Sequence, residues 1–224
     1  MSAVGEARPE AAAGTADELL SIAERLFAER GVENVALTQI VAQSSQRNRS
    51  AVHYHFGSRE GVLTAVLNRR LAPLNARREA LIEALPQRPS VAAIVRATIA
   101  PLGLAVVEAP WGPDYLSLVA QVRFRPTLFG AVTVEDEHLS GLRRCHRLLA
   151  AAAPQLPDAL LHQRLAWLTD SVVFALARWV RDTPPPARTV GAMAGLIDQL
   201  TAYGAAGLVA PDPSSPPSAP EPLS

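Results

Sequence analysis

The helical spacing of apolar residues constrains this chain more than any other feature. Apolar side chains recur every three or four positions along most of the 224 residues, and no stretch of five alternates cleanly between apolar and polar. The clearest stripe consists of Leu19, Ile22, Ala23, Leu26 and Phe27. Thr15 and Glu18 have capping-box spacing, and Gly31 is a typical C-terminal stop. The sequence therefore predicts an all-α protein whose first helix covers residues 15–30.

Prolines divide the rest of the chain into further helical segments, because proline interrupts a helix interior but is tolerated at its start. Two short helices are predicted first, over residues 38–44 and 48–55. The longer helices are predicted over residues 59–84, 90–108, 114–124, 127–152, 158–181 and 188–207.

Four regions follow from this pattern. Residues 211–224 contain six prolines and almost no apolar mass, so burial cannot repay the entropy of ordering them. The predicted regions are a disordered N-terminal arm (1–14), a small helical domain (15–62), a larger helical domain (63–209) and a disordered Pro/Ser-rich tail (210–224).

Charge and composition exclude several classes of protein. The 21 acidic residues balance 21 basic ones, all arginine, so no global field draws the chain to nucleic acid or membrane. The single cysteine, Cys145, excludes an internal disulfide and a multi-cysteine metal site. No run reaches the ~18 uncharged apolar residues of a membrane helix. The first residues include Glu6 and Arg8 in place of an apolar signal core. We expect a soluble, cytoplasmic protein.

Motifs for catalysis or metal binding are weak. Glu135 and His138 have the Glu-x-x-His spacing of carboxylate-bridged metal sites, but such a site needs a second motif and further glutamates. Cys145 and His146 are neighbours, which on a helix point about 100° apart and make a poor nucleophile–base pair. Glycine-rich phosphate loops and His-Glu-x-x-His are absent from the sequence. We expect no catalytic site, no metal and no cofactor.

Positive charge is concentrated in one window. Between Glu33 and Glu60 the only charged residues are Arg47, Arg49 and Arg59, a local charge of +3. The two short helices of this window are too short to be stable alone, so they must pack against their neighbours. The expected buried anchors are Ile40, Val41, Val52 and Phe56.

The second short helix is expected to present a polar face outward. With Asn48 as its N-cap, Val52 and Phe56 lie four apart and face inward. The residues left on the outer face and first turn are Arg49, Ser50, Ala51, His53 and Tyr54. Such a helix fits the major groove, where arginine can bind guanine, while hydroxyls such as that of Thr38 suit phosphates. From charge alone, a solvated polar turn between helices remains an equal alternative.

The stretch LTQIVAQSSQRNRSAVHYHFGSREGVL, with the helix before it, resembles the DNA-binding segment of TetR-family transcriptional regulators. The matching positions are Thr38, Val41-Ala42, Asn48, Val52, Tyr54-His55-Phe56 and Ser58-Arg59-Glu60. The resemblance covers roughly residues 15–65. It departs at Ser45-Gln46-Arg47, where the family usually has Ala-Gly-Val, so either Gln46 takes a left-handed conformation or the turn is shaped differently. His53 also replaces the usual aromatic residue.

The resemblance implies a helix-turn-helix domain over residues 15–62 and a ligand-binding and dimerisation domain over 63–209. It further implies a repressor that binds a palindromic operator in double-stranded DNA as a homodimer and responds to an unknown small-molecule effector. Arg49, Ala51 and His53 are implied to face base edges, with His55 either on the DNA backbone or packed inside. The full set of implied DNA-binding residues is Thr38, Gln39, Arg47, Asn48, Arg49, Ser50, Ala51, His53, Tyr54, His55 and Arg59.

In the larger half, the last two long helices carry apolar stripes that fit either a four-helix dimer interface or the chain's own core. The stripes are Leu161, Leu165, Leu168, Val172, Leu176 and Trp179, and Val190, Met193, Ile197, Leu200 and Gly204. The candidate ligand-pocket residues are Trp111, Tyr115, Phe124, Phe129, His146, Trp167, Asp170 and Phe174, with Arg123 beside them. The alternative function is a helical small-molecule-binding protein or enzyme in which residues 38–59 are only structural.

Overall fold

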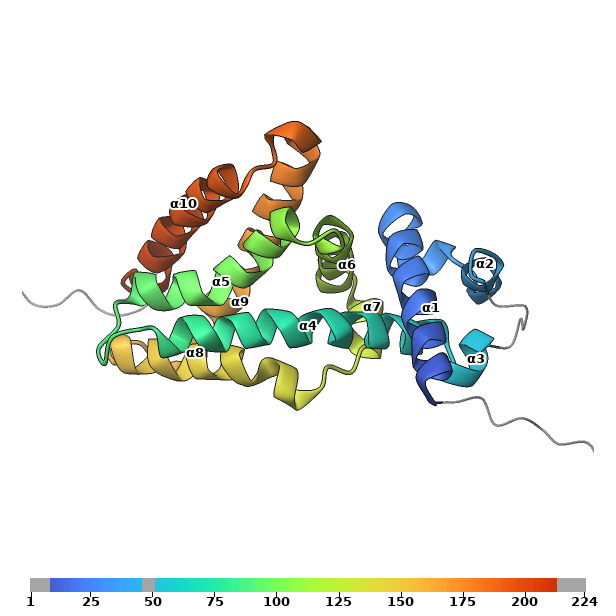
Figure 1. Ribbon diagram of the computed structural model, residues 1–224. Coiled ribbons are helices and arrows are strands. Elements are labelled where there is room, and N and C mark those ends of the chain that lie inside the picture. The colour runs from blue at the N-terminus through green and yellow to red at the C-terminus, as the bar shows by residue number, and fades with distance from the viewer. Residues whose placement is uncertain (1–8, 46–50, 213–224) are drawn as a thin grey trace, which may run out of the picture.

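The computed structural model describes residues 9–45 and 51–212, apart from the side chains of 9–13 and 51, and every regular element in them is helical (Figure 1). This confirms the all-α prediction. The longer elements are α1 (Pro9–Arg30), α4 (Arg59–Glu83), α5 (Val91–Glu108), α6 (Gly112–Phe124), α8 (Ser140–Ala152), α9 (Asp158–Asp182) and α10 (Val190–Val209). The shorter elements are α2 (Leu37–Ala42), α3 (Ala51–Phe56), α7 (Pro126–Ala131) and the 3-10 turns η1 (Val32–Asn34), η2 (Asp136–Leu139) and η3 (Pro185–Ala187).

The first helix starts earlier than predicted. It begins at Pro9, so residues 9–14 are helical and the prediction that they belong to a disordered arm is wrong. Thr15 therefore lies inside α1 and is not its N-cap. Proline suits the first position of a helix, and the alanines that follow have the highest helix propensity. In the predicted disordered tail, the carbonyls of Ala210 and Pro211 accept hydrogen bonds from Arg164, so the start of this segment is held. Residues 1–8 and 213–224 lie outside the described residues.

Helices α1, α2 and α3 form a small head at one end of the molecule, and α4 runs from this head along the larger half (Figure 1). Of the predicted anchors of the head, Ile40, Val41 and Val52 are buried and Phe56 is half-buried. One core cluster joins the head to α4, α6 and α7, and a second fills the space between α5, α8, α9 and α10. The head is thus packed directly onto the larger half.

The single helix predicted over residues 127–152 is wrong. The chain forms α7, a non-helical stretch, the turn η2 and then α8. The break begins at the β-branched residues Val132, Thr133 and Val134, which lower helix propensity. It is completed from outside the segment by two buried asparagines of α4.

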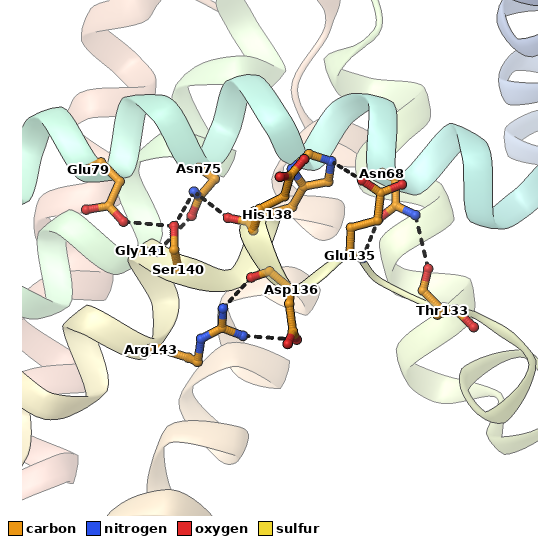
Figure 2. A network of polar contacts seen from close by, with 11 residues as sticks. Asn68, Asn75, Glu79, Thr133, Glu135, Asp136, His138, Ser140, Gly141 and Arg143 are labelled. Atoms are coloured by element: carbon orange, nitrogen blue, oxygen red, sulfur yellow. Dashed lines mark hydrogen bonds and ion pairs between the residues drawn. The ribbon is translucent and has the colours of Figure 1, made fainter.

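Asn68 and Asn75 hold this broken segment against α4 (Figure 2). The Asn68 side chain donates to the carbonyl of Thr133 and accepts from the amide of Glu135, both at 3.0 Å. Asn75 donates to the carbonyl of residue 137 at 3.2 Å and to the Ser140 hydroxyl at 2.8 Å, and accepts from the amide of residue 141 at 2.9 Å. The side-chain amides therefore satisfy backbone groups that helical bonds would otherwise satisfy.

Replacing Asn75 by alanine is expected to lower the free energy of unfolding by roughly 1–3 kcal/mol, because it leaves a buried backbone amide without an acceptor. Urea denaturation measures the change. Gln87→Ala, in the exposed turn after α4, is the matched control and is expected to stay within about 0.5 kcal/mol of the parent. Equal stability of the two variants would show that the Asn75 network contributes nothing.

The apolar stripes of α9 and α10 belong to the chain's own core rather than to a surface left for a partner. The stripe residues that are buried in the monomer are Leu161, Leu168, Val172, Leu176, Met193, Ile197 and Gly204. A Cβ at Gly204 would lie 2.5 Å from a methyl carbon of Leu168, so a larger residue there would force the Leu168 side chain to move. Only Val190 of the two stripes is exposed. Of the two alternatives for these stripes, the chain's own core therefore accounts for most of their residues, and a homodimer through the last two long helices stays a prediction.

Candidate nucleic-acid interface and ligand cavity

The residues that follow α2 are held in place by hydrogen bonds to α1. The amide and hydroxyl of Ser45 donate to the two carboxylate oxygens of Glu18 at 2.8 and 2.7 Å, and these bonds hold the pKa of Glu18 below its usual value. The guanidinium of Arg25 also donates to the side chain of Gln43 at 2.7 Å. The first part of the predicted reading turn is therefore anchored to the head.

Helix α3 presents two of the predicted DNA-binding side chains to solvent. Tyr54 is 85% exposed, and His53 is exposed as well, while His55 is half-buried. The Nδ1 atom of His53 lies 2.8 Å from the carbonyl oxygen of Gly57. Because a carbonyl only accepts, Nδ1 is the ring nitrogen that donates in this contact. Gly57, at φ +71°, provides the left-handed residue that ends the helix.

The predicted contacts at the start of α2 are exposed. Thr38 lies in the first turn and not at the N-cap, which is Ala36. The Gln39 side chain accepts from the amide of Ala36 at 3.0 Å and so takes over part of the capping role that alanine cannot perform. Thr38 keeps its hydroxyl at the surface.

Arg59 is already engaged within the protein. Its guanidinium donates to the carbonyl of Glu33 at 2.8 Å and lies 3.5 Å from the Glu60 carboxylate. The Arg59 guanidinium is therefore less available for a DNA phosphate than the sequence indicates. Four other predicted DNA-binding residues, Arg47, Asn48, Arg49 and Ser50, lie outside the described residues, as does the side chain of Ala51.

Two of the contact sets that join the head to the larger half involve the C-terminal half of α1. Glu24 of α1 is 3% exposed, and its carboxylate accepts three hydrogen bonds of 2.6–3.0 Å from Arg70 of α4. The Arg70 guanidinium also lies 4.7 Å from the ring centroid of Trp111. On α6, the Gln121 side chain donates to the carbonyl of Phe27 and accepts from the amide of Val32, both at 3.0 Å. Helices α4 and α6 therefore hold the C-terminal half of α1.

A cavity of about 550 Å³ lies inside the larger half, within the range of small-molecule sites. Helices α4, α5, α6, α8 and α9 and the segment held by Asn68 and Asn75 contribute to its wall. Its lining is mainly aliphatic, with polar groups at Arg78, Thr98, Tyr115, Arg123 and Thr169.

Two of the predicted pocket residues, Tyr115 and Phe129, line this cavity, as does Arg123. The other six lie elsewhere. Trp111 packs edge-on against Tyr115, His146 lies 3.6 Å from the carboxylate of Asp158, and Asp170 binds Arg123 at 2.5 Å. Three further candidates are exposed at the surface, namely Phe124, Trp167 and Phe174.

The sequence reasoning missed Arg78, which lines the cavity and is only 5% exposed. A signal was present, because Arg78 continues the apolar row of Leu67, Leu71 and Leu74 on α4 at steps of three and four. An arginine at a core position of a helix is unusual and indicates a special role.

The described part of the chain offers few groups suited to catalysis. Cys145 is buried, and burial raises the pKa of its thiol, so the thiol is unreactive. Possible ligand atoms of Glu135, Glu137 and His138 lie within 4.8 Å of one another, but both carboxylates are exposed and such clusters are common without a metal. One described helix, α5, is long and apolar enough to span a membrane, but half of it is buried in the fold, as in the core helix of a soluble protein.

Comparison with known families matches residues 19–66 to the bacterial regulatory proteins of the tetR family and residues 96–207 to the tetracyclin repressor-like C-terminal domain. The chain belongs to the TetR family of transcriptional regulators. It is a DNA-binding regulator with a helix-turn-helix domain and a ligand-binding C-terminal domain. TetR-family regulators are generally non-enzymatic, soluble proteins that bind DNA and small-molecule effectors, typically as dimers.

Solved structures of TetR-family regulators share this fold at low sequence identity. The fatty acid degradation regulator FadR from Bacillus halodurans aligns with a TM-score of 0.63 and 13% identity, over 85% of this chain and 98% of that one. The ketosteroid regulator KstR2 of Mycobacterium tuberculosis gives 0.56 and 18%, over 91% and 96%. The regulator PfmR from Thermus thermophilus gives 0.53 and 19%, over 86% and 97%. No curated protein matches the sequence.

Proposed function

We propose that this TetR-family protein is a cytoplasmic repressor that binds a palindromic operator as a homodimer and releases it when an effector occupies the cavity. The observation that carries the proposal is the head, in which α3 is packed by buried Val52 while the side chains of Tyr54 and His53 are exposed. A short helix held in this way can enter the major groove, which is about 12 Å wide.

The proposed dimer uses the outer face of α9 and α10. Trp167 and Phe174 are seven residues apart on α9, hence on one face, and are 58% and 60% exposed. Tyr203 of α10 is 66% exposed and lines a shallow groove together with Trp167. Large exposed aromatic side chains that gather on one surface are typical of protein interfaces. This face differs from the stripes that the sequence indicated.

The proposed effector response passes through α6. Tyr115, Val119 and Val122 of this helix line the cavity, whereas Gln121 binds the end of α1. Occupation of the cavity that shifts α6 must therefore move or break the Gln121 bonds to the head. In a dimer, that movement changes the separation of the two reading helices, which must fit half-sites roughly 34–36 Å apart.

Selection from random duplex DNA tests the function. The protein is expected to enrich an inverted repeat, and its affinity for that repeat is expected to fall steeply with salt because arginine contacts release counterions from phosphates. Enrichment of no sequence, or of a site without two-fold symmetry, would contradict the proposal and favour a binding protein or enzyme with a merely structural head.

Two arginine variants separate base reading from backbone binding. Arg49→Ala is expected to cost roughly 1–3 kcal/mol on the selected operator and to relax preference at one position in each half-site. Arg59→Ala is expected to weaken all sequences alike and by less, since Arg59 is held by Glu33 and Glu60. Titration of fluorescent duplexes measures both effects. If neither variant changes binding, the assignment of this surface is wrong.

A further inference from the structure

We propose that the effector is an amphiphilic monocarboxylate, whose carboxylate pairs with Arg78 while its apolar body fills the cavity. This inference rests on the proposed function, because it assigns a chemical class to the effector. It depends on three properties of the cavity, which are a buried guanidinium with an unpartnered nitrogen, a mainly aliphatic wall and a phenol without a hydrogen-bond partner among the described residues.

Arg78 is a buried cation that the protein does not neutralise. Among the described residues, no carboxylate lies within 4.0 Å of its guanidinium, and its Nη1 atom is buried without a hydrogen-bond partner. The adjacent Glu79 is instead bound to Arg144 at 3.0 Å and to Ser140 at 2.9 Å. The remaining nitrogens of Arg78 share one acceptor, the carbonyl of Thr98, at 3.4 Å.

An unpaired guanidinium in such a place is costly, and burial lowers the pKa of Arg78 for the same reason. A buried charge is normally paired or fully hydrogen-bonded. The second arginine of the cavity satisfies this rule, since Arg123 is paired with Asp170 at 2.5 Å and is more exposed. Of the two arginines that line the cavity, Arg78 is therefore the one that can form an ion pair with a bound ligand.

The rest of the cavity fits the remainder of such a ligand. Its aliphatic wall includes Leu71, Leu74, Ile99 and Leu102, which suit a hydrocarbon chain or ring. The Tyr115 hydroxyl has no hydrogen-bond partner among the residues that the structure describes, and burial raises its pKa, so it stays a protonated donor. A carboxylate accepts hydrogen bonds from both a guanidinium and a phenol. A purely apolar ligand would need neither the guanidinium nor the phenol.

Calorimetric titration of the full chain, without DNA, tests the inference with matched probes. Decanoate is compared with decanol and decyltrimethylammonium, and naphthalene-2-carboxylate with naphthalene-2-methanol. Each carboxylate is expected to bind at least about tenfold more tightly than its neutral partner, the difference that a charge-assisted hydrogen bond supplies. Equal affinities, tighter binding of the cation, or no binding of either carboxylate would overturn the inference, and none of these outcomes depends on a variant.

The variant Arg78→Met keeps a similar apolar volume and assigns the effect to one residue. It is expected to reduce the affinity for decanoate to about that of decanol, while the affinity for decanol changes less than threefold. Arg123→Met is the control, and its decanoate affinity is expected to stay within about threefold because Asp170 already neutralises that arginine. The reverse pattern, with Arg123 and not Arg78 controlling decanoate, would refute the assignment.

The failure of the inference is distinguishable from that of the proposed function, because DNA binding is measured separately. Decanoate that binds through Arg78 but leaves operator affinity unchanged supports the carboxylate site and contradicts only the regulatory response. An operator-binding protein that treats carboxylate and alcohol alike contradicts the carboxylate site and leaves the DNA-binding function supported.

Discussion

Glu24→Ala is expected to lower the free energy of unfolding by about 3–5 kcal/mol. The substitution leaves Arg70 of α4 largely buried and without its carboxylate partner. It also removes the buried one of the polar contacts between α1 and α4 that hold the head on the larger half. Urea or thermal denaturation of the variant measures the loss, and operator affinity is expected to fall with it because the head is no longer held in one position.

Two controls separate the buried pair from an ordinary surface charge. Replacing both partners, Glu24→Leu with Arg70→Met, is expected to recover most of the stability, since an apolar pair of similar volume replaces a buried ion pair at little cost. Glu29→Ala removes the exposed ion pair with Arg25 and is expected to cost less than about 1 kcal/mol. A Glu24→Ala variant as stable as Glu29→Ala would show that the Glu24–Arg70 contact does not hold the head.

Phe174→Glu is expected to convert the proposed dimer into a monomer and to weaken operator binding by at least about a hundredfold. A glutamate in the centre of an aromatic interface is buried without a partner in the assembled state, which costs several kcal/mol. Loss of the second head also removes one of two half-sites from every complex. Sedimentation velocity measures the mass, and titration of labelled operator measures the affinity.

Phe124→Glu is the matched control, because Phe124 is a similarly exposed phenylalanine that belongs to α6 and not to α9 or α10. That variant is expected to remain dimeric. A dimer that survives Phe174→Glu, or that is lost equally in Phe124→Glu, would contradict the assignment of the interface while leaving the fold unaffected.

The sequence predicted most helices because their signals are local. Apolar spacing marked α1, and prolines marked the ends of the later helices within about two residues in most cases. The helix predicted over residues 127–152 was wrong because the cause of its break lies in contacts across the fold, from Asn68 and Asn75 on α4. Such contacts cannot be predicted from the residues that are adjacent in the sequence.

The candidate sites were predicted unequally for a related reason. The reading helix follows from a short contiguous motif, so Tyr54 and His53 could be placed outward from sequence. The cavity is built from residues far apart in the chain, and a list of aromatic and polar residues found only Tyr115, Arg123 and Phe129. Periodicity also shows that a helix has an apolar face but not which neighbour covers it, which is why the sequence left the stripes of α9 and α10 open between a partner and the chain's own core.

The most direct test of the account is the mass of the complex with the operator obtained by selection. Sedimentation or light scattering on that duplex is expected to give two chains per inverted repeat, with half-sites separated by roughly 34–36 Å or a whole number of helical turns. One chain bound to one site, or an isolated chain that binds DNA as tightly as the repeat does, would contradict the reading of this protein as a two-headed regulator.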